Sequence, residues 1–251
     1  MVVSRGKNST SSHRCKRSLA NESPIHRRNI HGRRQGRPLS FSRQNTLDTL
    51  LPTLSLPELK DDGTLDPATL YAKPHKRFVL EIGIGNGEHL ANMMIARPDA
   101  GYIGAEPYIN GMTAFLKSIA DQPKDNIRVW MDDALMIVRS LKDASLDAIY
   151  ILNPDPWPKA RHFKRRIVRL ETLALYHRVL KPGGDLIMAT DVDGLAEWML
   201  TQTLQHGGFD WQAEKASDWN TMPDGWYATR YETKGKVAGR SQSYILFKKK
   251  A

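Results

Sequence analysis

The stretch RFVLEIGIGNGE, residues 77–88, decides the fold. It begins with a short apolar run suited to a buried strand and continues with glycines at Gly83, Gly85 and Gly87. A periodic apolar run, 89–96, follows at once and predicts a helix. Glycine permits backbone angles and a close approach that a side chain forbids, and the first turn of a helix offers unpaired N–H groups. This order of elements therefore predicts a cradle for a nucleotide-like ligand.

The chemistry of this turn favours a cationic ligand over a dinucleotide. Its spacing is G-x-G-x-G, whereas the dinucleotide fingerprint needs a further glycine at the position of Glu88. Glu81 precedes the first glycine by two residues, at the end of the expected strand. A carboxylate there repels a pyrophosphate but suits a ligand with positive charge and hydroxyl groups, such as S-adenosylmethionine. The alternative is an ordinary structural turn.

Three further acidic residues stand at or just after the ends of the next two expected strands. Glu106 ends the second strand, 25 residues after Glu81, at the place where this type of fold grips the hydroxyl groups of a ribose. Asp132 and Asp133 follow the third strand, where an acid can accept the amino hydrogen of adenine. The alternatives are an exposed glutamate at a strand end and, for Asp133, a helix N-cap. Together these positions suit the adenosine half of such a ligand.

From Arg77 onward, strands and helices alternate, which predicts a parallel sheet covered on both faces. The segments 209–212 and 243–248 predict a terminal antiparallel pair. The fold class is therefore α/β and Rossmann-like, with a mostly parallel seven-stranded sheet and helices on both faces. The expected parallel strands lie near 78–82, 102–106, 127–131, 147–152 and 185–190, and the expected helices near 88–97, 109–121, 134–141, 163–180 and 193–206.

The net charge of +10 is concentrated at the N-terminus. Residues 1–45 hold 11 of the 37 Lys and Arg residues and one of the 27 acidic residues, so the remainder carries 26 of each sign. A segment so basic and so poor in apolar residues cannot fold alone, and it suits a polyanion. An organelle transit peptide is the alternative. We expect a disordered basic arm over 1–32, an extension packed on the domain over 33–76, and the α/β domain over 77–251.

The composition disfavours several classes of protein. No apolar run is long enough to span a membrane or to form the core of a signal peptide. Cys15 is the only cysteine, which excludes an intrachain disulfide and a cysteine-based zinc site. The histidines are scattered, without the spacing of metal ligands. We therefore expect a cytoplasmic protein that binds neither a membrane nor a metal.

The segment LNPDPWPKARHFKRRIVR, residues 152–169, is the densest in chemical groups. Its three prolines hold the chain extended at the end of the fourth expected strand, at the edge where open α/β sheets bind ligands. A run of cations follows without one acid. At that edge such a run favours phosphate binding, with a solvated face as the alternative. Trp157 suits either stacking on a base or packing. The six cations are Lys159, Arg161, Lys164, Arg165, Arg166 and Arg169.

Asp155 separates this segment from the N-P-P-W motif of amino-group methyltransferases, which clamps an exocyclic amine. A carboxylate suits a ring nitrogen such as guanine N7, which carries a lone pair and no proton, so that methylation needs no base. Methylation leaves a cationic ring that a nearby carboxylate stabilises, and alignment of the reacting atoms supplies most of the rest. Asp191, at the end of the fifth expected strand, is another carboxylate at this edge, or an N-cap.

Taken together, the motifs resemble the bacterial tRNA (guanine-N7)-methyltransferase family. LEIGIGNG, the strand end at Glu106, DDA, NPDPWPKARHFKRR, MATD and TRYE occur here in that family's order, over roughly residues 33–248. The run PDPW-x-KARH-x-KRR is the most specific part. The resemblance implies a class I methyltransferase that uses S-adenosylmethionine to methylate guanine N7 in the variable loop of tRNA, giving 7-methylguanosine and S-adenosylhomocysteine. The arm before Arg33 is not part of the shared pattern.

The resemblance also implies roles for particular residues. Asp155 would act in catalysis, and with Asp191 it would orient the base and offset its charge. The implied cofactor-binding residues are Glu81, Gly83, Gly85, Gly87, Glu106, Asp133 and Asp155. The implied substrate-binding residues are Lys159, Asp191, Thr229, Arg230, Tyr231 and Glu232, and the implied RNA-binding residues are Arg161, His162, Phe163, Lys164, Arg165 and Arg166.

Two rival functions follow from the same sequence. A catalytically silent RNA-binding or scaffold protein would keep the fold, but the intact acidic set of Glu81, Asp133 and Asp155 disfavours it. A nicotinamide oxidoreductase would need a glycine at position 88. The sequence leaves open whether the chain is a monomer or a homodimer.

Overall fold

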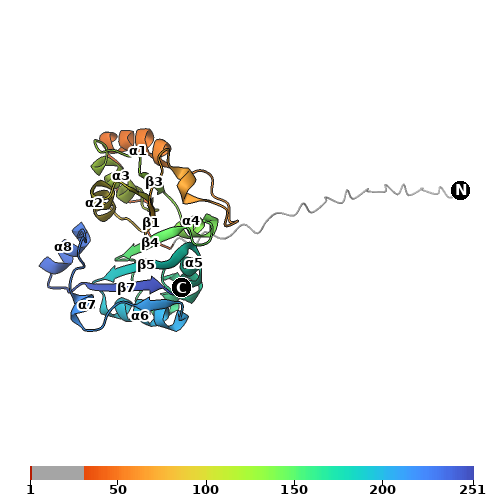
Figure 1. Ribbon diagram of the computed structural model, residues 1–251. Coiled ribbons are helices and arrows are strands. Elements are labelled where there is room, and N and C mark those ends of the chain that lie inside the picture. The colour runs from red at the N-terminus through yellow and green to blue at the C-terminus, as the bar shows by residue number, and fades with distance from the viewer. Residues whose placement is uncertain (2–30) are drawn as a thin grey trace.

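Strand β1, Arg77–Ile82, lies near the middle of a seven-stranded sheet, and five of its six residues are buried. The computed structural model describes residue 1 and residues 31–251 (Figure 1). The strand order is β3-β2-β1-β4-β5-β7-β6, in which β1 to β5 are parallel and β7 is antiparallel to both of its neighbours. The predicted α/β class, the mostly parallel sheet and the terminal antiparallel pair are confirmed. The other strands are β2 Ala100–Ala105, β3 Ile127–Trp130, β4 Leu146–Leu152, β5 Leu180–Thr190, β6 Phe209–Trp211 and β7 Ser243–Lys249.

Alternate residues of the central strands face two different apolar clusters, as the period of a strand dictates. Val79 packs in a cluster with helices α1, α2 and α3, whereas Leu80 packs in a cluster with α4, α5 and α6. Figure 1 shows these two groups of helices on opposite sides of the sheet. Their bounds are α1 Phe41–Leu54, α2 Glu88–Ala96, α3 Ile109–Ser118, α4 Ala134–Ser140, α5 Leu170–Val179 and α6 Asp193–His206.

The N-terminal extension is attached to the domain by a helix and two isolated bridges. Leu47 and Leu54, seven residues apart and so on one face of α1, are buried in the cluster that contains α3. After the helix, the Leu56 N–H donates to the Val129 carbonyl at 3.0 Å. A second bridge joins Leu65 to Leu141, with the 3₁₀ turn η1 (Pro67–Leu70) just beyond it.

The single helix expected over 163–180 is wrong in its first half. Residues Ala160–Arg165 form a 3₁₀ helix, η2, and α5 begins only at Leu170. Between them Arg169 has extended backbone angles, φ −159° and ψ 166°. The helix ends at Val179, as the following Pro-Gly-Gly run predicts within one residue.

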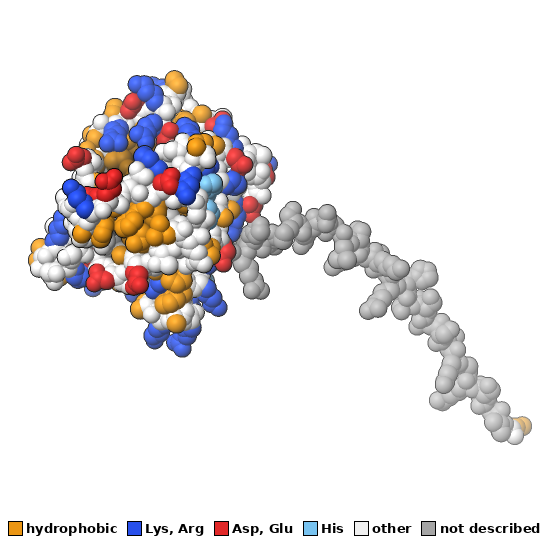
Figure 2. Space-filling model, turned by 60° about the horizontal axis from the view of Figure 1, so that its bottom comes forward, with side chains coloured by type: hydrophobic (Ala, Val, Ile, Leu, Met, Phe, Trp, Pro, Cys, Tyr) orange, Lys and Arg blue, Asp and Glu red, His pale blue; other side chains and the backbone are white. Residues whose placement is uncertain are grey.

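The C-terminal part contains two helices that the sequence analysis did not predict, α7 (Ser217–Asn220) and α8 (Arg230–Val237). Across residue 1 and residues 31–251, no helix is long and apolar enough to cross a membrane. On the face drawn in Figure 2, basic and acidic side chains are interspersed around an apolar patch, in keeping with the balanced charge beyond residue 45. The arm over residues 1–32 is predicted to be disordered, and residues 2–30 of it lie outside the described part of the chain.

Candidate functional site

A cavity of about 510 Å³ opens at the carboxyl ends of the parallel strands. Ile82 and Gly83 line it from the end of β1, Glu106 from the end of β2, and Asp133 from the residues after β3. The segment 152–155 lines it from the end of β4. The cavity therefore lies in the crevice where open α/β sheets bind ligands, and its volume is within the range of small-molecule sites.

Two different physical constraints favour glycine at the three positions of the turn. All three have positive φ: 75° at Gly83, 57° at Gly85 and 77° at Gly87. A Cβ atom added to Gly83 or Gly85 would meet no protein atom within 4 Å, and both residues line the cavity. A Cβ atom on Gly87 would lie 2.2 Å from Phe115 Cδ2. Gly83 and Gly85 thus leave room for a ligand against the main chain, whereas Gly87 lets α3 pack closely.

Glu106 is held rigidly at the mouth of the turn. Its Oε2 accepts from the Gly85 N–H at 2.7 Å, and its Oε1 accepts from the Tyr108 N–H at 2.9 Å. Burial raises the pKa of this carboxyl group, and the nearby Asp155 charge acts in the same direction, whereas the two N–H donors oppose them. Each oxygen keeps further acceptor capacity, so a fixed carboxylate with room for hydroxyl donors faces the cavity.

Asp133 fulfils the expectation of an N-cap while also lining the cavity. Its Oδ1 accepts from the Leu135 N–H at 2.9 Å, which satisfies one of the free donors at the start of α4. The neighbouring Asp132 also lines the cavity and forms an ion pair with Arg34 at 3.6 Å. The capping role therefore does not compete with a role toward a ligand.

Glu81 is placed differently from the other acidic residues. Within the described part of the chain it is not among the residues that line the cavity, and only 2% of it is exposed. Its Oε2 lies 2.7 Å from His89 Nδ1 on α2. The structure thus brings Glu106, Asp133 and Asp155 to one cavity, and buries Glu81 one residue before Ile82, which does line it.

The proline-rich end of β4 is bent through two unusual backbone conformations. Asn153 and Trp157 have positive φ, 47° and 41°, a region that costs an ordinary residue about 1–2 kcal/mol. Asn153 is fixed by an N–H bond to the Ala189 carbonyl at 2.8 Å, and its Oδ1 accepts from Gln242 at 2.9 Å. Asp155, between these two residues, is exposed and lines the cavity. Strain of this kind is typical of segments that present a functional side chain.

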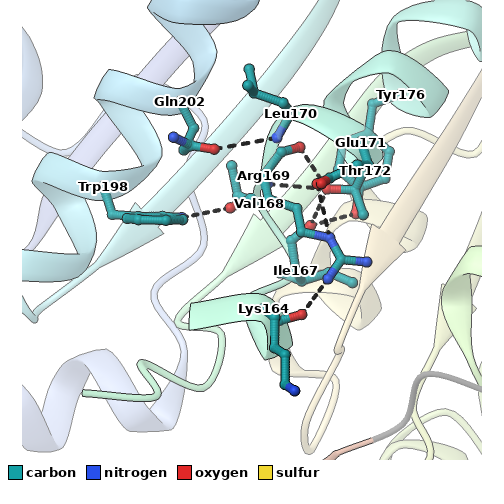
Figure 3. Close-up of polar contacts among 10 residues, drawn as sticks. All are labelled: Lys164, Ile167, Val168, Arg169, Leu170, Glu171, Thr172, Tyr176, Trp198 and Gln202. Carbon is teal, nitrogen blue, oxygen red and sulfur yellow. Dashed lines mark hydrogen bonds and ion pairs between the residues drawn. The ribbon is translucent and has the colours of Figure 1, made fainter. Parts of the chain in front are cut away.

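Side chains from α5 and α6 hold Ile167 and Val168, which lie within the basic run just before Arg169 (Figure 3). The Ile167 carbonyl accepts from Thr172 Oγ1 at 2.6 Å and from the Tyr176 hydroxyl at 3.1 Å. The Val168 carbonyl accepts from the Trp198 indole at 2.7 Å. Because these carbonyls are bonded to side chains, they are not used in a continuous helix. This explains why the expected helix is interrupted here.

Arg166 departs from the predicted set of RNA-binding residues. It is 7% exposed, its Nε donates to the Pro156 carbonyl at 2.9 Å, and its guanidinium lies 3.9 Å from the ring centre of Phe163. Burial lowers the pKa of Arg166. Its charge therefore serves the local structure and not a surface contact. The predicted cations Lys159, Arg161 and Lys164 are exposed, as are parts of His162 and Arg165.

Arg165 and His162 surround Trp157 at the rim of the cavity. The Arg165 guanidinium lies 4.9 Å from the centre of the Trp157 ring, and the His162 ring meets it edge-on at 5.8 Å. Desolvation and the neighbouring Arg165 lower the pKa of His162. Both Trp157 and Arg165 line the cavity, so the basic run and the cavity share one edge.

Of the predicted substrate-binding residues, Asp191 and Thr229–Glu232 gather around the start of α8, whereas Lys159 lies apart from them in sequence as the N-cap of η2. Asp191 is buried, and its Oδ2 lies 2.6 Å from Arg240 Nε. Burial, followed by the Asp191 charge, raises the pKa of the half-exposed Tyr231. Thr229 caps the helix by accepting from the Glu232 N–H at 3.1 Å, while Arg230 is exposed. Glu232 itself is 1% exposed, so its carboxylate faces the protein interior.

Sequence reasoning missed the residues just before and at the start of the extension. His31, Gly32 and Arg33 line the cavity, and a Cβ atom on Gly32 would lie 3.2 Å from Asp155 Oδ2. The sequence does carry a signal for this contact, namely Gly32 and Gly36 within a basic stretch. Gly36 also lies close to the domain, since a Cβ atom added to it would be 2.2 Å from the Tyr108 hydroxyl. Among residue 1 and residues 31–251, no group of three or more His, Cys, Asp or Glu side chains is arranged to hold a metal ion.

Known methyltransferases are similar to this chain. A family model described as "Putative methyltransferase" matches residues 75–244. A curated tRNA (guanine-N(7)-)-methyltransferase of Rhizobium johnstonii is 44% identical over 218 residues, which cover 87% of this chain and 93% of the relative. A protein of the same name from Rhodospirillum rubrum is 39% identical over 91% of both chains. Among solved structures, a mutant 16S rRNA (adenine(1408)-N(1))-methyltransferase from Catenulisporales acidiphilia has a TM-score of 0.48 and 16% identity, covering 77% of this chain and 99% of that one.

Proposed function

This chain belongs to the family of tRNA (guanine-N(7)-)-methyltransferases, and from that premise we propose that it methylates N7 of a guanine in the variable loop of tRNA. The donor is S-adenosylmethionine, and the products are 7-methylguanosine and S-adenosylhomocysteine. One observation carries the proposal: a single cavity at the sheet edge is lined by Glu106, Asp133 and Asp155 and is bordered by the basic run. Acidic groups for a cationic donor and cations for RNA thus meet at one edge.

The donor half of the cavity fits an adenosine-containing cation. When bound, S-adenosylmethionine supplies an electrophilic methyl group on its sulfonium. Glu106 would accept hydrogen bonds from the ribose hydroxyls, because both of its oxygens are already oriented by main-chain donors. Asp133 would accept from the adenine amino group. Gly83 and Gly85 would let the ligand approach the main chain, since side chains at these positions would protrude into the cavity.

The acceptor half depends on Asp155. Burial is the main cause of the raised pKa of Glu106 and of Tyr231, and the Asp155 carboxylate adds to both, so it lies near the donor side and near the α8 side of the site. Guanine N7 needs no general base, because it carries no proton. Asp155 would therefore orient the base and stabilise the positive charge that methylation leaves on the ring. Asp191, fixed by Arg240, and the start of α8 would hold the guanine nucleotide.

The exposed cations beside the cavity would bind the RNA backbone. Lys159, Arg161 and Lys164 are exposed and lie within six residues of each other on η2 and its N-cap. Phosphate contacts of this kind give affinity and position without reading sequence. With tRNA as its partner, the protein would act in the cytoplasm, and this methyl transfer would need no metal ion.

The proposed function is tested with radiolabelled S-adenosylmethionine and bulk tRNA. Label should pass from the cofactor to tRNA and should be absent from a reaction with double-stranded DNA. Separate calorimetric titration with S-adenosylhomocysteine distinguishes this enzyme from a silent RNA-binding protein. Binding of RNA without binding of the cofactor product would instead support the silent protein.

A further inference from the structure

His89 is a buried polar residue that takes part in none of the functions proposed above. It lies in the first turn of α2 and is 1% exposed. Its Nδ1 is 2.7 Å from Glu81 Oε2, and an ionised carboxylate can only accept a hydrogen bond. With the hydrogen on Nδ1, His89 donates to this carboxylate and fixes its direction at the end of β1.

The His89 ring also packs against the segment that leads into α8. The ring centres of His89 and Trp226 are 5.1 Å apart, and those of His89 and Tyr227 are 6.5 Å apart. Tyr150 of β4 packs against the same ring at 5.0 Å. Trp226 therefore packs directly against the His89 ring.

Trp226 in turn orients the start of α8. Its indole Nε1 donates to Glu232 Oε2 at 3.0 Å. The second oxygen, Oε1, accepts from the Tyr244 hydroxyl of β7, and Lys236 lies 3.5 Å from it. A continuous set of contacts thus runs from Glu81 through His89 and Trp226 to Glu232. It connects the strand end below the donor cavity with the segment Thr229–Glu232.

We propose that His89 is a positioning residue that aligns the donor and acceptor halves of the site. Its Nδ1–H holds Glu81 and so the strand end that precedes Ile82, which lines the donor cavity. Its ring packs against Trp226, and Trp226 in turn positions the acceptor segment Thr229–Glu232 through its bond to Glu232. The inference rests on the proposed function, because it gives donor and acceptor roles to the two ends of this set of contacts.

Two substitutions separate the two contacts. His89→Phe keeps a ring for Trp226 and removes the donor to Glu81. His89→Asn keeps an N–H near the position of Nδ1 and removes the ring. His177→Asn is the matched control, because it removes the same ring at the far ends of α5 and α6, where His177 contacts His206 and Phe209.

The dissociation constant of S-adenosylhomocysteine and the KM for tRNA are measured for each variant, with the unfolding midpoint alongside. His89→Phe should weaken cofactor-product binding about tenfold, as expected for one hydrogen bond to a charged group, with KM nearly unchanged. His89→Asn should raise the KM for tRNA about fivefold, as expected for removal of one aromatic ring from a packed pair, with cofactor-product binding nearly unchanged. His177→Asn should alter neither constant.

If both His89 variants lower only the unfolding midpoint and leave both constants unchanged, or if they shift both constants equally, the inference is wrong. Should His89→Phe fail to fold, it is combined with Glu81→Gln, which replaces the buried carboxyl group that has lost its partner. The double variant should then bind S-adenosylhomocysteine like Glu81→Gln alone, and a further loss of affinity would contradict the proposed contact. Methylation by the wild-type protein is measured in parallel, so that failure of the proposed function is seen separately.

Discussion

The guanidinium of Arg166 donates from Nε to the carbonyl oxygen of Pro156 at 2.9 Å. This bond ties the basic run back to the strand end that carries Asp155. The same guanidinium packs against two neighbouring aromatic rings, 3.9 Å from the centre of Phe163 and 4.7 Å from that of Trp198, whose centres are 5.0 Å apart. Arg166 therefore fixes the relation between the two parts of the site, the carboxylate at the cavity and the cations beside it.

Replacement of Arg166 by Gln should lower stability and activity together. The change removes a buried charge-assisted hydrogen bond and two ring contacts, and the free energy of unfolding should fall by about 1–3 kcal/mol. Urea denaturation measures this change. The salt dependence of tRNA binding should stay as in the wild type, because a buried guanidinium neutralises no phosphate. A reduced salt slope with unchanged stability would instead place Arg166 on the RNA.

Replacement of Arg161 and Lys164 by Gln should have the opposite profile. Both side chains are exposed, so stability should hardly change, whereas the slope of log affinity against log salt should decrease by about 0.7–0.9 for each phosphate that is no longer neutralised. Filter binding of tRNA at several salt concentrations gives the slope. Lys248→Gln with Lys250→Gln makes the same change of charge at the C-terminus, where the two lysines pair with Asp185 and Asp210. Equal slopes in the two double variants would make η2 an ordinary solvated surface.

Substitutions at two glycines of the turn should separate effects on cofactor-product binding from effects on protein stability. Gly85→Ala and Gly87→Ala both place an alanine at positive φ, which costs about 1–2 kcal/mol. Gly85→Ala should in addition weaken binding of S-adenosylhomocysteine, because its methyl group enters the cavity. Gly87→Ala should destabilise by about 1–3 kcal/mol more through its clash with the buried Phe115. Calorimetry and thermal unfolding of both variants measure the two effects, and an equal reduction of binding in the two would contradict the assignment.

Glu106 predicts a dependence of cofactor binding on pH. Its pKa is raised above the ordinary value of 4.5, chiefly by burial, and only the ionised form can accept from two ribose hydroxyls. Binding of S-adenosylhomocysteine should therefore weaken as the pH falls through this raised pKa, at a higher pH than for an unperturbed glutamate. Glu106→Gln should bind more weakly and lose that dependence. An identical pH profile in the variant would remove Glu106 from the cofactor site.

The same raised pKa has a defined effect on stability. Between the pKa of the unfolded chain and that of the folded protein, the folded state binds more protons at Glu106. The contribution of Glu106 to the free energy of unfolding must then decrease as the pH rises through this interval. This sign is opposite to that of a carboxylate held in an ion pair, and comparison of wild type with Glu106→Gln by urea denaturation at several pH values checks it.

The sheet and the cavity could be predicted because their signals are local. Buried parallel strands appear as apolar runs, and the glycines mark the turn after β1, so Glu106 and Asp133 could be placed at strand ends before any coordinates. The start of α8 also has a local signal in the sequence. Thr229 and Glu232 have the spacing of a capping box, and Thr229 does cap the helix, although the Glu232 carboxylate turns inward to Trp226.

The remaining features depend on residues far apart in the chain. The helix expected from residue 163 is interrupted by bonds such as the one from Trp198 to the Val168 carbonyl, 30 residues away. Arg166 cannot be told from Arg165 by residue type, since only the fold shows which one is buried. The bond between His89 and Glu81 joins two residues within one motif, but its link to Trp226 crosses more than half of the chain.

Nucleoside analysis of methylated tRNA tests the central claim most directly. Bulk tRNA is incubated with S-adenosylmethionine and the protein, digested and analysed by mass spectrometry, and the modified position is mapped by sequencing. We predict 7-methylguanosine in the variable loop, and we expect Asp155→Asn to form it about 10²-fold more slowly while still binding tRNA. Methylation at another atom or another base, or full activity of Asp155→Asn, would contradict the account.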